Sequence, residues 1–218
     1  MTDVVFTCAK CGAESCTNEL KEFPQNCMTL KARERHILEE ALKEYETKAE
    51  ILAIAKAAAA VEAEYYCKAT RAEEIVHFAK GMNHKKIGIA TCAGLFEETR
   101  IFAKMLEAAN LIPVGVACKT GRVDKQYIGI PEEGKVRPGC FEPMCNPVLQ
   151  AMVLNDENTD LNVIVGLCVG HDSLFIKYSK APVTSFITKD RILAHNPAGA
   201  LYTSKTYYKR MLETYSHE

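Results

Sequence analysis

A thiol and an imidazole lie three residues apart in the run 162–173, which reads Asn-Val-Ile-Val-Gly-Leu-Cys-Val-Gly-His-Asp-Ser. The β-branched residues 163–165 predict a short strand that is buried on both faces. The two glycines that follow predict the end of this strand, so Cys168 and His171 are expected where the strand gives way to a helix. Ligands of open parallel sheets bind at this edge. The pair is therefore placed for chemistry, although a buried cysteine beside a turn histidine is the simpler interpretation of these two residues alone.

Two earlier apolar runs end in the same way. Residues 87–94 form an apolar run that ends in Cys92 and Gly94, and residues 111–121 form another that ends in Cys118 and Gly121. The segment between them has apolar residues at helical spacing, which predicts a strand–helix–strand unit with parallel strands. Parallel strands end at the same edge of a sheet, so the three thiols, Cys168 included, are expected side by side at one edge.

Two further thiols follow a polar excursion over residues 122–138. Cys140 and Cys145 lie in a Pro-rich loop that can fold over the same edge. Five thiols and up to two imidazoles exceed the four ligands of a structural zinc site, whereas several irons need several thiolate anchors. We therefore expect a shared metal site, which fits an iron–sulfur cluster best by its count of ligands. Its expected cofactor-binding residues are Cys92, Cys118, Cys140, Cys145, Cys168 and His171, with His195 as a further metal ligand.

The surroundings of this edge suit a group of thiolates. Helix N-termini offer backbone N–H groups and the positive ends of helix dipoles, which favour bound negative charge. Lys119 and Lys189 are candidates to offset more of that charge. Asp172 is expected to be the N-cap of the helix that follows Cys168.

The amino-terminal 30 residues carry another four thiols, spaced C-x2-C-x4-C-x10-C. Few apolar residues surround them, so a bound metal would have to supply the missing folding energy. Four thiolates suit either a tetrahedral zinc or a four-iron cluster, and the spacing matches neither a zinc ribbon nor the compact run of bacterial ferredoxins. We expect a metal site with the metal left open, and its ligands are Cys8, Cys11, Cys16 and Cys27.

The remaining sequence predicts an α/β fold, in which a parallel sheet is flanked by helices. Ala, Glu, Lys and Leu at helical spacing predict two helices or one long broken helix over residues 30–68, and another near residues 70–80. The pair Asn146-Pro147 predicts a capped helix start, residues 182–188 predict a fourth strand, and residues 203–215 predict a terminal helix. The expected domains are a Cys-rich metal-binding segment, a helical region and an α/β domain that holds the strand-end thiols, over residues 1–30, 31–82 and 83–218.

Composition narrows the class of protein. The chain has 218 residues, ten cysteines and a formal net charge of −1, which gives no electrostatic case for nucleic-acid binding. No apolar run approaches the ~20 residues of a membrane span, and the first residues lack the pattern of a signal peptide. We therefore expect a cytoplasmic protein that binds neither membrane nor nucleic acid. In a reducing compartment, ten cysteines favour metal ligation or thiol chemistry over disulfides.

Several runs carry a resemblance to a known family. They are Gly-Ile-Ala-Thr-Cys-Ala-Gly-Leu at 88–95, Cys-Asn-Pro at 145–147, the run 166–175, Lys-Asp-Arg at 189–191 and His-Asn-Pro at 195–197. The chain resembles an uncharacterised family of cysteine-rich proteins from largely anaerobic bacteria and archaea. That family is catalogued as a domain of unknown function and is often labelled only "metal-binding protein". The resemblance covers nearly the whole chain, and it implies metal binding and an anaerobic setting without an established reaction.

Three functional hypotheses follow. The first is an iron–sulfur protein with two Cys-ligated sites and a redox or small-ligand role, whose partner is a redox protein or a small ligand. The second is a zinc-binding protein without redox activity. The third is a thiol enzyme in which His171 and a helix N-terminus activate Cys168 as the nucleophile, which leaves the other strand-end thiols unexplained.

Overall fold

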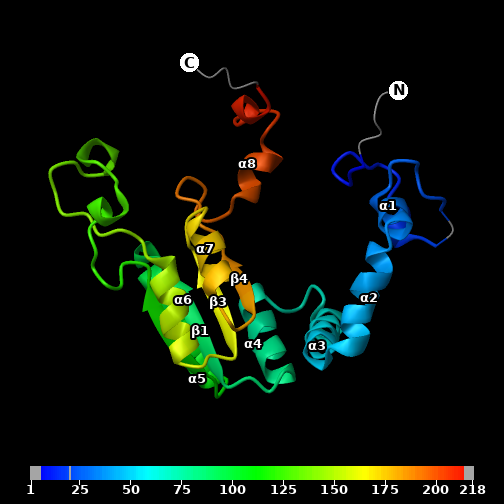
Figure 1. Cartoon of the computed structure of the whole chain (residues 1–218), viewed down its shortest axis with the longest axis horizontal. Helices are drawn as coiled ribbons and strands as arrows, with labels where there is room; N and C mark the ends of the chain where they lie inside the picture. The colour runs from blue at the N-terminus through cyan, green and yellow to red at the C-terminus, as the bar shows by residue number, and fades with distance from the viewer. Residues whose placement is uncertain (1–5, 20, 214–218) are drawn as a thin grey trace. The chain divides into compact units, whose positions relative to one another are not determined.

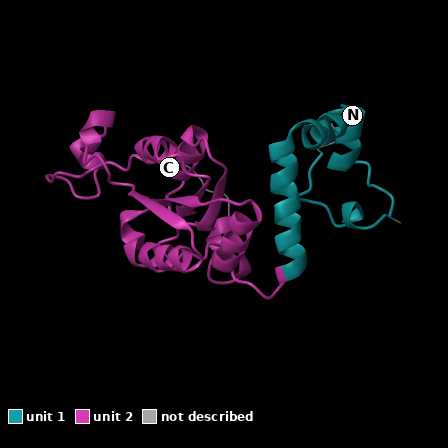
Figure 2. Cartoon of the chain, turned by 90° about the horizontal axis from the view of Figure 1, so that it is seen from below, with its two compact units in different colours: residues 1–64 teal, residues 65–218 magenta. Residues whose placement is uncertain are grey.

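The computed structural model describes residues 6–19 and 21–213 (Figure 1). The chain forms two compact units, residues 1–64 and residues 65–218 (Figure 2). None of the helices in the described ranges is long and apolar enough to cross a membrane. The three-part division into domains stays a prediction.

The first unit is helical. It contains the 3-10 helix η1 (Ser15–Thr17) and the helices α1 (Met28–Glu34), α2 (Ile37–Thr47) and α3 (Ala49–Tyr65). A left-handed residue, His36, separates α1 from α2, and the extended Lys48 separates α2 from α3. Among the described residues of this unit Ser15 is buried, but no side chain of α1, α2 or α3 is. The unit therefore lacks an apolar core of its own in the part that is described.

The second unit is built on a four-stranded sheet, which confirms the predicted α/β fold. Its strands are β1 (Lys86–Thr91), β2 (Ile112–Ala117), β3 (Leu161–Val165) and β4 (Val183–Ile187). They lie in the order β2-β1-β3-β4, and each neighbouring pair is parallel. Thr91 of β1 is in register with Ala117 of β2 and Val165 of β3, so these three strands end level with one another.

Helices cover both faces of the sheet. On one face lie α4 (Arg71–Gly81) and α5 (Phe96–Ala108), and on the other lie α6 (Pro147–Asp156) and α7 (His171–Tyr178) (Figure 1). Alternation along β1 supplies both cores, because Ile87 and Ile89 face the first pair of helices while Ala90 faces the second. Gly88 lacks a side chain for a clear reason: an added Cβ would lie 2.0 Å from the amide oxygen of the buried Asn162.

Local signals place the helix ends next to the thiols. Asn146 caps α6 by accepting a hydrogen bond from the Leu149 N–H at 3.0 Å, with proline at the first helical position, as predicted. The predicted N-cap at Asp172 is wrong, because α7 begins at His171, two residues before the start that such a cap would give. Gly170, at φ 85°, makes the turn and takes the N-cap position, while the Asp172 carboxylate accepts the Ser173 N–H at 2.8 Å.

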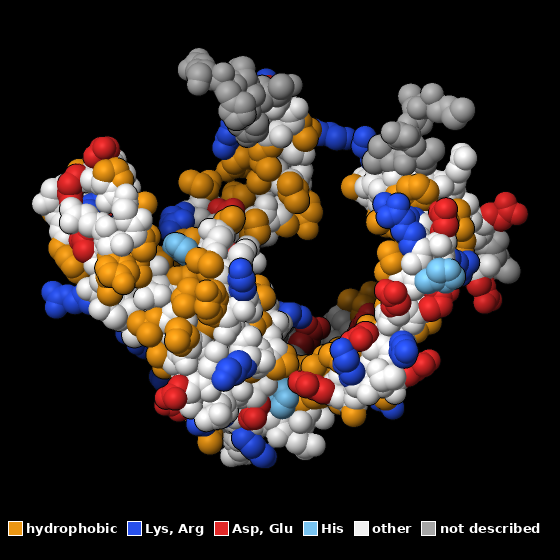
Figure 3. Space-filling view, viewed as in Figure 1, with side chains coloured by type: hydrophobic (Ala, Val, Ile, Leu, Met, Phe, Trp, Pro, Cys, Tyr) orange, Lys and Arg blue, Asp and Glu red, His pale blue; other side chains and the backbone are white. Residues whose placement is uncertain are grey.

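The two long connections have little regular structure. The excursion between β2 and α6 contains the 3-10 helices η3 (Lys125–Ile128) and η4 (Glu132–Gly134) and the bridge Asp124–Pro143. After β4 come α8 (Ala198–Tyr202) and the 3-10 helix η5 (Lys209–Leu212). Hydrophobic side chains gather on the surface around α8, where Leu201 and Tyr202 are exposed (Figure 3).

The single terminal helix predicted over residues 203–215 does not form within the described residues, and its last two residues lie outside them. Hydroxyl side chains explain the break. Thr203 donates to the Gly199 carbonyl at 2.8 Å, and Thr206 donates to the Thr203 carbonyl at 3.2 Å. Such side-chain hydrogen bonds offer the backbone an alternative to a continuous helix.

Candidate functional site at the strand ends

Cysteines directly follow the first two strands of the sheet. The backbone ladder continues for one residue past the strand ends, because Cys92 N–H donates to the Val165 carbonyl at 3.0 Å and Cys118 N–H donates to the Thr91 carbonyl at 2.8 Å. Both thiols are therefore held by the sheet itself rather than by a loose loop. This confirms the prediction that the strands ending at these cysteines and the strand before Cys168 are parallel members of one sheet.

Cys145 joins them from the end of the excursion. The Asn146 N–H next to it donates to the Cys118 carbonyl at 2.8 Å, and the Met144 N–H donates to the Val123 carbonyl at 2.8 Å. Because α6 begins just after this cap, the capped helix start fixes the direction of the chain at this thiol. Cys145 packs against the same core as the buried Cys118.

Cys118 lies between two other thiols and changes the acidity of both. Its hydrogen bond is the main cause that lowers the pKa of Cys92 to about 5, and it likewise lowers the pKa of Cys145 to about 5. The contacts with Cys145 and Cys92, followed by burial, raise the pKa of Cys118 itself. The two outer thiols are therefore more acidic than an ordinary thiol, and the central thiol is less acidic.

Cys168 is the fourth thiol of this edge, and its partner is an arginine. The guanidinium of Arg191 donates to the Cys168 sulfur at 3.1 Å. This hydrogen bond and the charge of Cys168 raise the pKa of Arg191, and the charges of Cys92 and Cys145 contribute in the same direction. Arg191 is therefore within electrostatic reach of three of the four thiols.

Two lysines add further positive charge next to these thiols. Lys189 helps to lower the pKa of Cys92, and Lys119 helps to lower that of Cys145. Lys119 also donates to the Pro143 carbonyl. In the described part of the chain, neither these lysines nor Arg191 forms an ion pair with a carboxylate. Their positive charge is thus directed at the thiols.

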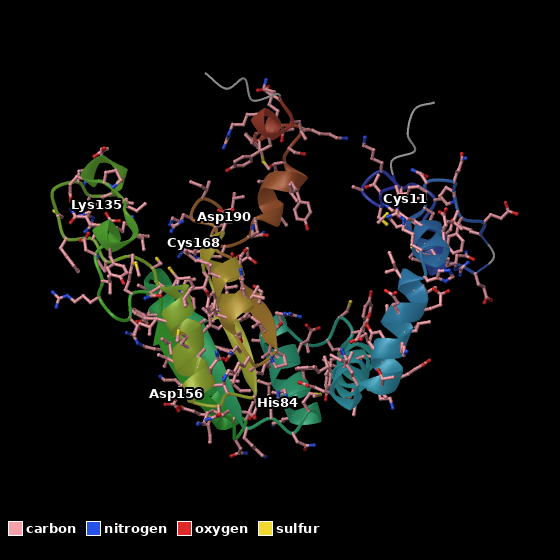
Figure 4. All side chains as sticks on the ribbon, in the orientation of Figure 1. Cys11, His84, Lys135, Asp156, Cys168 and Asp190 are labelled. Carbon is pink, nitrogen blue, oxygen red and sulfur yellow. The ribbon has the colours of Figure 1, made fainter. Side chains whose placement is uncertain are left out.

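The site lies at the point where the strand order reverses. From β1 the chain adds β2 on one side and then β3 on the other, so the crevice between the ends of β1 and β3 is the usual ligand position of such sheets. Cys92 and Cys168 follow these two strands. Figure 4 shows Cys168 and Asp190 at the upper end of the sheet, away from His84 and Asp156 at its lower end.

The histidines predicted as ligands have different places. His171 is the first residue of α7, and its charge helps to lower the pKa of Cys145, so it borders the thiols. His195 instead closes a turn with Asp190. Its ring Nδ1 accepts the Asp190 backbone N–H at 3.1 Å, and its backbone N–H donates to the Asp190 carbonyl at 2.9 Å.

Cys140 lies in the excursion, where it is exposed. Its carbonyl accepts a hydrogen bond from Lys135 at 3.3 Å, and it lines a shallow hollow of about 540 Å³ together with Asp124 and Phe141. Lys135 is itself buried against Asp124, at 3.2 Å, and Glu132, at 2.6 Å. Figure 4 shows Lys135 in this excursion, apart from Cys168. The structure thus gathers Cys92, Cys118, Cys145 and Cys168, and places Cys140 elsewhere.

The amino-terminal thiols belong to the other unit. Cys8, Cys11 and Cys16 are exposed, and Cys27 is half-buried at the N-cap of α1. Cys11 N–H donates to the Cys8 carbonyl at 3.1 Å, which forms a turn between these two thiols. A hydrogen bond with Thr29 lowers the pKa of Cys27. Within the described ranges, no three His, Cys, Asp or Glu side chains form a group that could hold a metal ion as they stand.

Arg191 is a site residue that was not predicted from the sequence. Among the cations after the fourth predicted strand, the sequence pointed to Lys189 and not to Arg191. Arg191 follows β4 at nearly the same distance as Cys168 follows β3. A cation in that position was therefore visible in the sequence once β4 was recognised as a neighbour of β3.

The fold and the site define a cysteine-rich α/β protein whose thiols gather at the carboxyl edge of a parallel sheet. The chain belongs to the family described as "Protein of unknown function (DUF1847)", whose model matches residues 27–186. It is also 50% identical over 187 residues to "Uncharacterized protein MJ0455" from Methanocaldococcus jannaschii, an alignment that covers 86% of this chain and 94% of that protein. The resemblance to an uncharacterised family with archaeal members is therefore confirmed.

Proposed function

We propose that the chain is an iron–sulfur protein and that its strand-end thiols hold a cluster with a redox or small-ligand role. One observation carries the proposal. Four thiols converge from three strand ends and a capped helix start, and three cations without carboxylate partners in the described residues surround them. The ligands of this site would be Cys92, Cys118, Cys145 and Cys168.

The chemistry of these donors fits such a group. Metal ligation needs thiolates, and Cys92 and Cys145 already have pKa values lowered to about 5. Four cysteines are also the common ligand number of [2Fe–2S] and [4Fe–4S] clusters. When bound, a cluster would supply one-electron transfer. The chain would hold it, balance its charge and keep a crevice for a ligand at the reversal of strand order.

Four thiolates also suit a tetrahedral zinc ion, which is the zinc-binding alternative at this edge. Because the described side chains form no group that could hold a metal ion as they stand, the four thiols would rearrange on binding either a cluster or a zinc ion.

We propose a second metal site on the amino-terminal thiols, with a role in electron entry. Its support is the turn between Cys8 and Cys11 and the lack of buried helical side chains in the described part of that unit. Small segments without a core commonly depend on a metal for folding. The partner proposed for this function is a redox protein.

Metal analysis of protein purified without oxygen tests the proposal. We expect iron and acid-labile sulfide in comparable amounts, together with an absorption spectrum that bleaches on reduction. Cys67→Ser is the matched control, because Cys67 is exposed and lies outside both groups of thiols. Zinc without iron would overturn the proposal in favour of the zinc-binding alternative.

The thiol-enzyme alternative has a specific observation in its favour, although not at the residue first expected. Cys168 contacts Arg191. The lowered pKa values belong to Cys92 and Cys145, and the charge of His171 helps to lower that of Cys145. A nucleophile would therefore be Cys145 rather than Cys168. Protein that holds no metal at all and alkylates fastest at Cys145 would support this alternative.

A further inference from the structure

The loop after β4 carries two cations that reach different strands. Arg191 donates to the sulfur of Cys168, which follows β3. The charge of Lys189 helps to lower the pKa of Cys92, which follows β1. A Cβ added at Gly94 would lie 3.4 Å from the Lys189 ammonium and 4.0 Å from the Cys92 sulfur, which places that ammonium beside this thiol. The two cations therefore span the crevice where the strand order reverses.

The same loop is fixed by its own hydrogen bonds. The Asp190 carboxylate accepts the N–H groups of Ile192 at 2.9 Å and Leu193 at 2.8 Å, and the paired contacts of His195 with Asp190 close the turn. Asp190 is thus engaged by backbone donors and forms no ion pair with its neighbours Lys189 and Arg191 in the described residues. The turn presents both cations, and in the described residues neither is ion-paired with the carboxylate between them.

We infer that Lys189 and Arg191 are positioning residues that set the reduction potential of the metal centre held by the strand-end thiols. This inference rests on the proposed iron–sulfur function. Reduction adds an electron to a centre that is already ligated by thiolates, and a nearby positive charge stabilises the reduced form more than the oxidised one. Net charge and hydrogen bonds to the sulfurs are general determinants of cluster potentials, and Arg191 supplies both to Cys168.

Charge-changing variants of the anaerobically prepared protein test the inference. Arg191→Gln and Lys189→Gln each remove one positive charge, and Arg191→Lys keeps the charge while it loses the planar guanidinium. Lys177→Gln is the control, because Lys177 is exposed in the last turn of α7, at the opposite end of the helix from Cys168. The midpoint potential of each protein is measured by optical titration with mediators, and iron per chain and circular dichroism are recorded alongside.

We expect each Gln variant to shift the one-electron equilibrium at least tenfold toward the oxidised form, which is a midpoint about 59 mV more negative. Arg191→Lys and Lys177→Gln should stay within threefold of the wild type. Equal midpoints in the wild type and both Gln variants, with iron retained, would overturn the inference and leave the proposed function standing. Loss of iron from both Gln variants but not from the control would assign the two cations a purely structural role instead. A wild-type protein without iron would overturn the inference and the proposed function together.

Discussion

At the residue scale, the centre of the site is Cys118. It is the most buried of the strand-end thiols, and its sulfur accepts the Ala93 N–H at 3.3 Å while it contacts both Cys92 and Cys145. These contacts favour the thiolate forms of Cys92 and Cys145 at this half-buried edge. In the proposed site, a metal ligated by all three thiols would displace the Cys118 proton, so metal binding there would depend on pH.

Removing that proton donor has a measurable consequence in the metal-free, reduced protein. We predict that Cys92 and Cys145 react with iodoacetamide with pH midpoints near 5 in the wild type. Cys118→Ala should move both midpoints upward, toward the ordinary thiol value of about 8.5, because the hydrogen bond that stabilises the thiolates is lost. Cys118→Ser is the matched control, since its hydroxyl keeps a donor in place. Site-resolved mass spectrometry gives the midpoints, and identical values in the wild type and Cys118→Ala would contradict this account.

The residues that sequence alone could place are those whose position follows from a strand end. Cys92, Cys118 and Cys168 each follow an apolar run, and parallel strands must end at one edge, so their convergence was predictable. Cys140 and Cys145 share a loop, and no spacing rule tells which of them folds back to the sheet. In the structure Cys145 lies at the sheet. Cys140 does not, because the buried Lys135 binds its carbonyl within the connection between β2 and α6. Lys189 was predicted near the thiols, but no spacing rule tells which cation of the loop after β4 contacts Cys168, so Arg191 was not predicted.

At the element scale, the turn after β3 sets where Cys168 lies. Gly166 has φ 72°, and an added Cβ would lie 1.9 Å from Cδ1 of the buried Leu95. The turn therefore packs closely against the segment that follows Cys92. Gly170 also has a positive φ, of 85°, but nothing lies within 4 Å of an added Cβ.

These two glycines make a matched pair for a stability measurement. Gly170→Ala should cost only the backbone strain of about 1–2 kcal/mol. Gly166→Ala should cost the same strain plus about 1–3 kcal/mol for overpacking against Leu95, and it should also lower metal retention. Urea denaturation of both variants gives the free energies of unfolding. Equal losses in the two variants would show that the contact with Leu95 relaxes freely.

The N-cap of α6 is a second feature that positions a thiol, because the cap residue, Asn146, directly follows Cys145. We predict that Asn146→Ala lowers the free energy of unfolding by about 1 kcal/mol, since the Leu149 N–H loses its acceptor. Asn146→Asp keeps an acceptor and should stay close to the wild type. Denaturant titration compares the two, and an unchanged stability of Asn146→Ala would mean that the cap contributes nothing to the position of Cys145.

Elements were predictable from sequence where pattern and packing agree. The buried strands and the Asn146 cap were placed correctly because each has a strong local signal. The start of α7 was misplaced by two residues, since a glycine turn at Gly170 overrode the capping preference of Asp172. The terminal helix failed because Thr203 and Thr206 bond to the backbone locally, which is a competition that apolar spacing does not reveal.

At the scale of the whole molecule, the two units differ in how they are stabilised. The sheet unit has two apolar cores, whereas none of the described side chains of α1, α2 and α3 is buried. We predict that a chelator increases proteolytic cleavage within residues 6–30 before it affects residues 86–187, because the metal proposed there would supply folding energy that the first unit lacks. Peptide mapping with and without chelator measures this. Equal protection of residues 6–30 in both samples would count against a metal in that unit.

The most direct test of the central claim is the amount of iron and sulfide bound per chain when each group of thiols is changed separately. Cys92→Ser combined with Cys168→Ser should remove the metal of the strand-end site and leave the amino-terminal site loaded. Cys8→Ser combined with Cys11→Ser should do the reverse, because the two groups lie on different units and share no ligand. Cys67→Ser should retain the full complement. If the variant with the strand-end changes folds and keeps all the iron and sulfide of the wild type, the strand-end thiols are not metal ligands and the account is wrong.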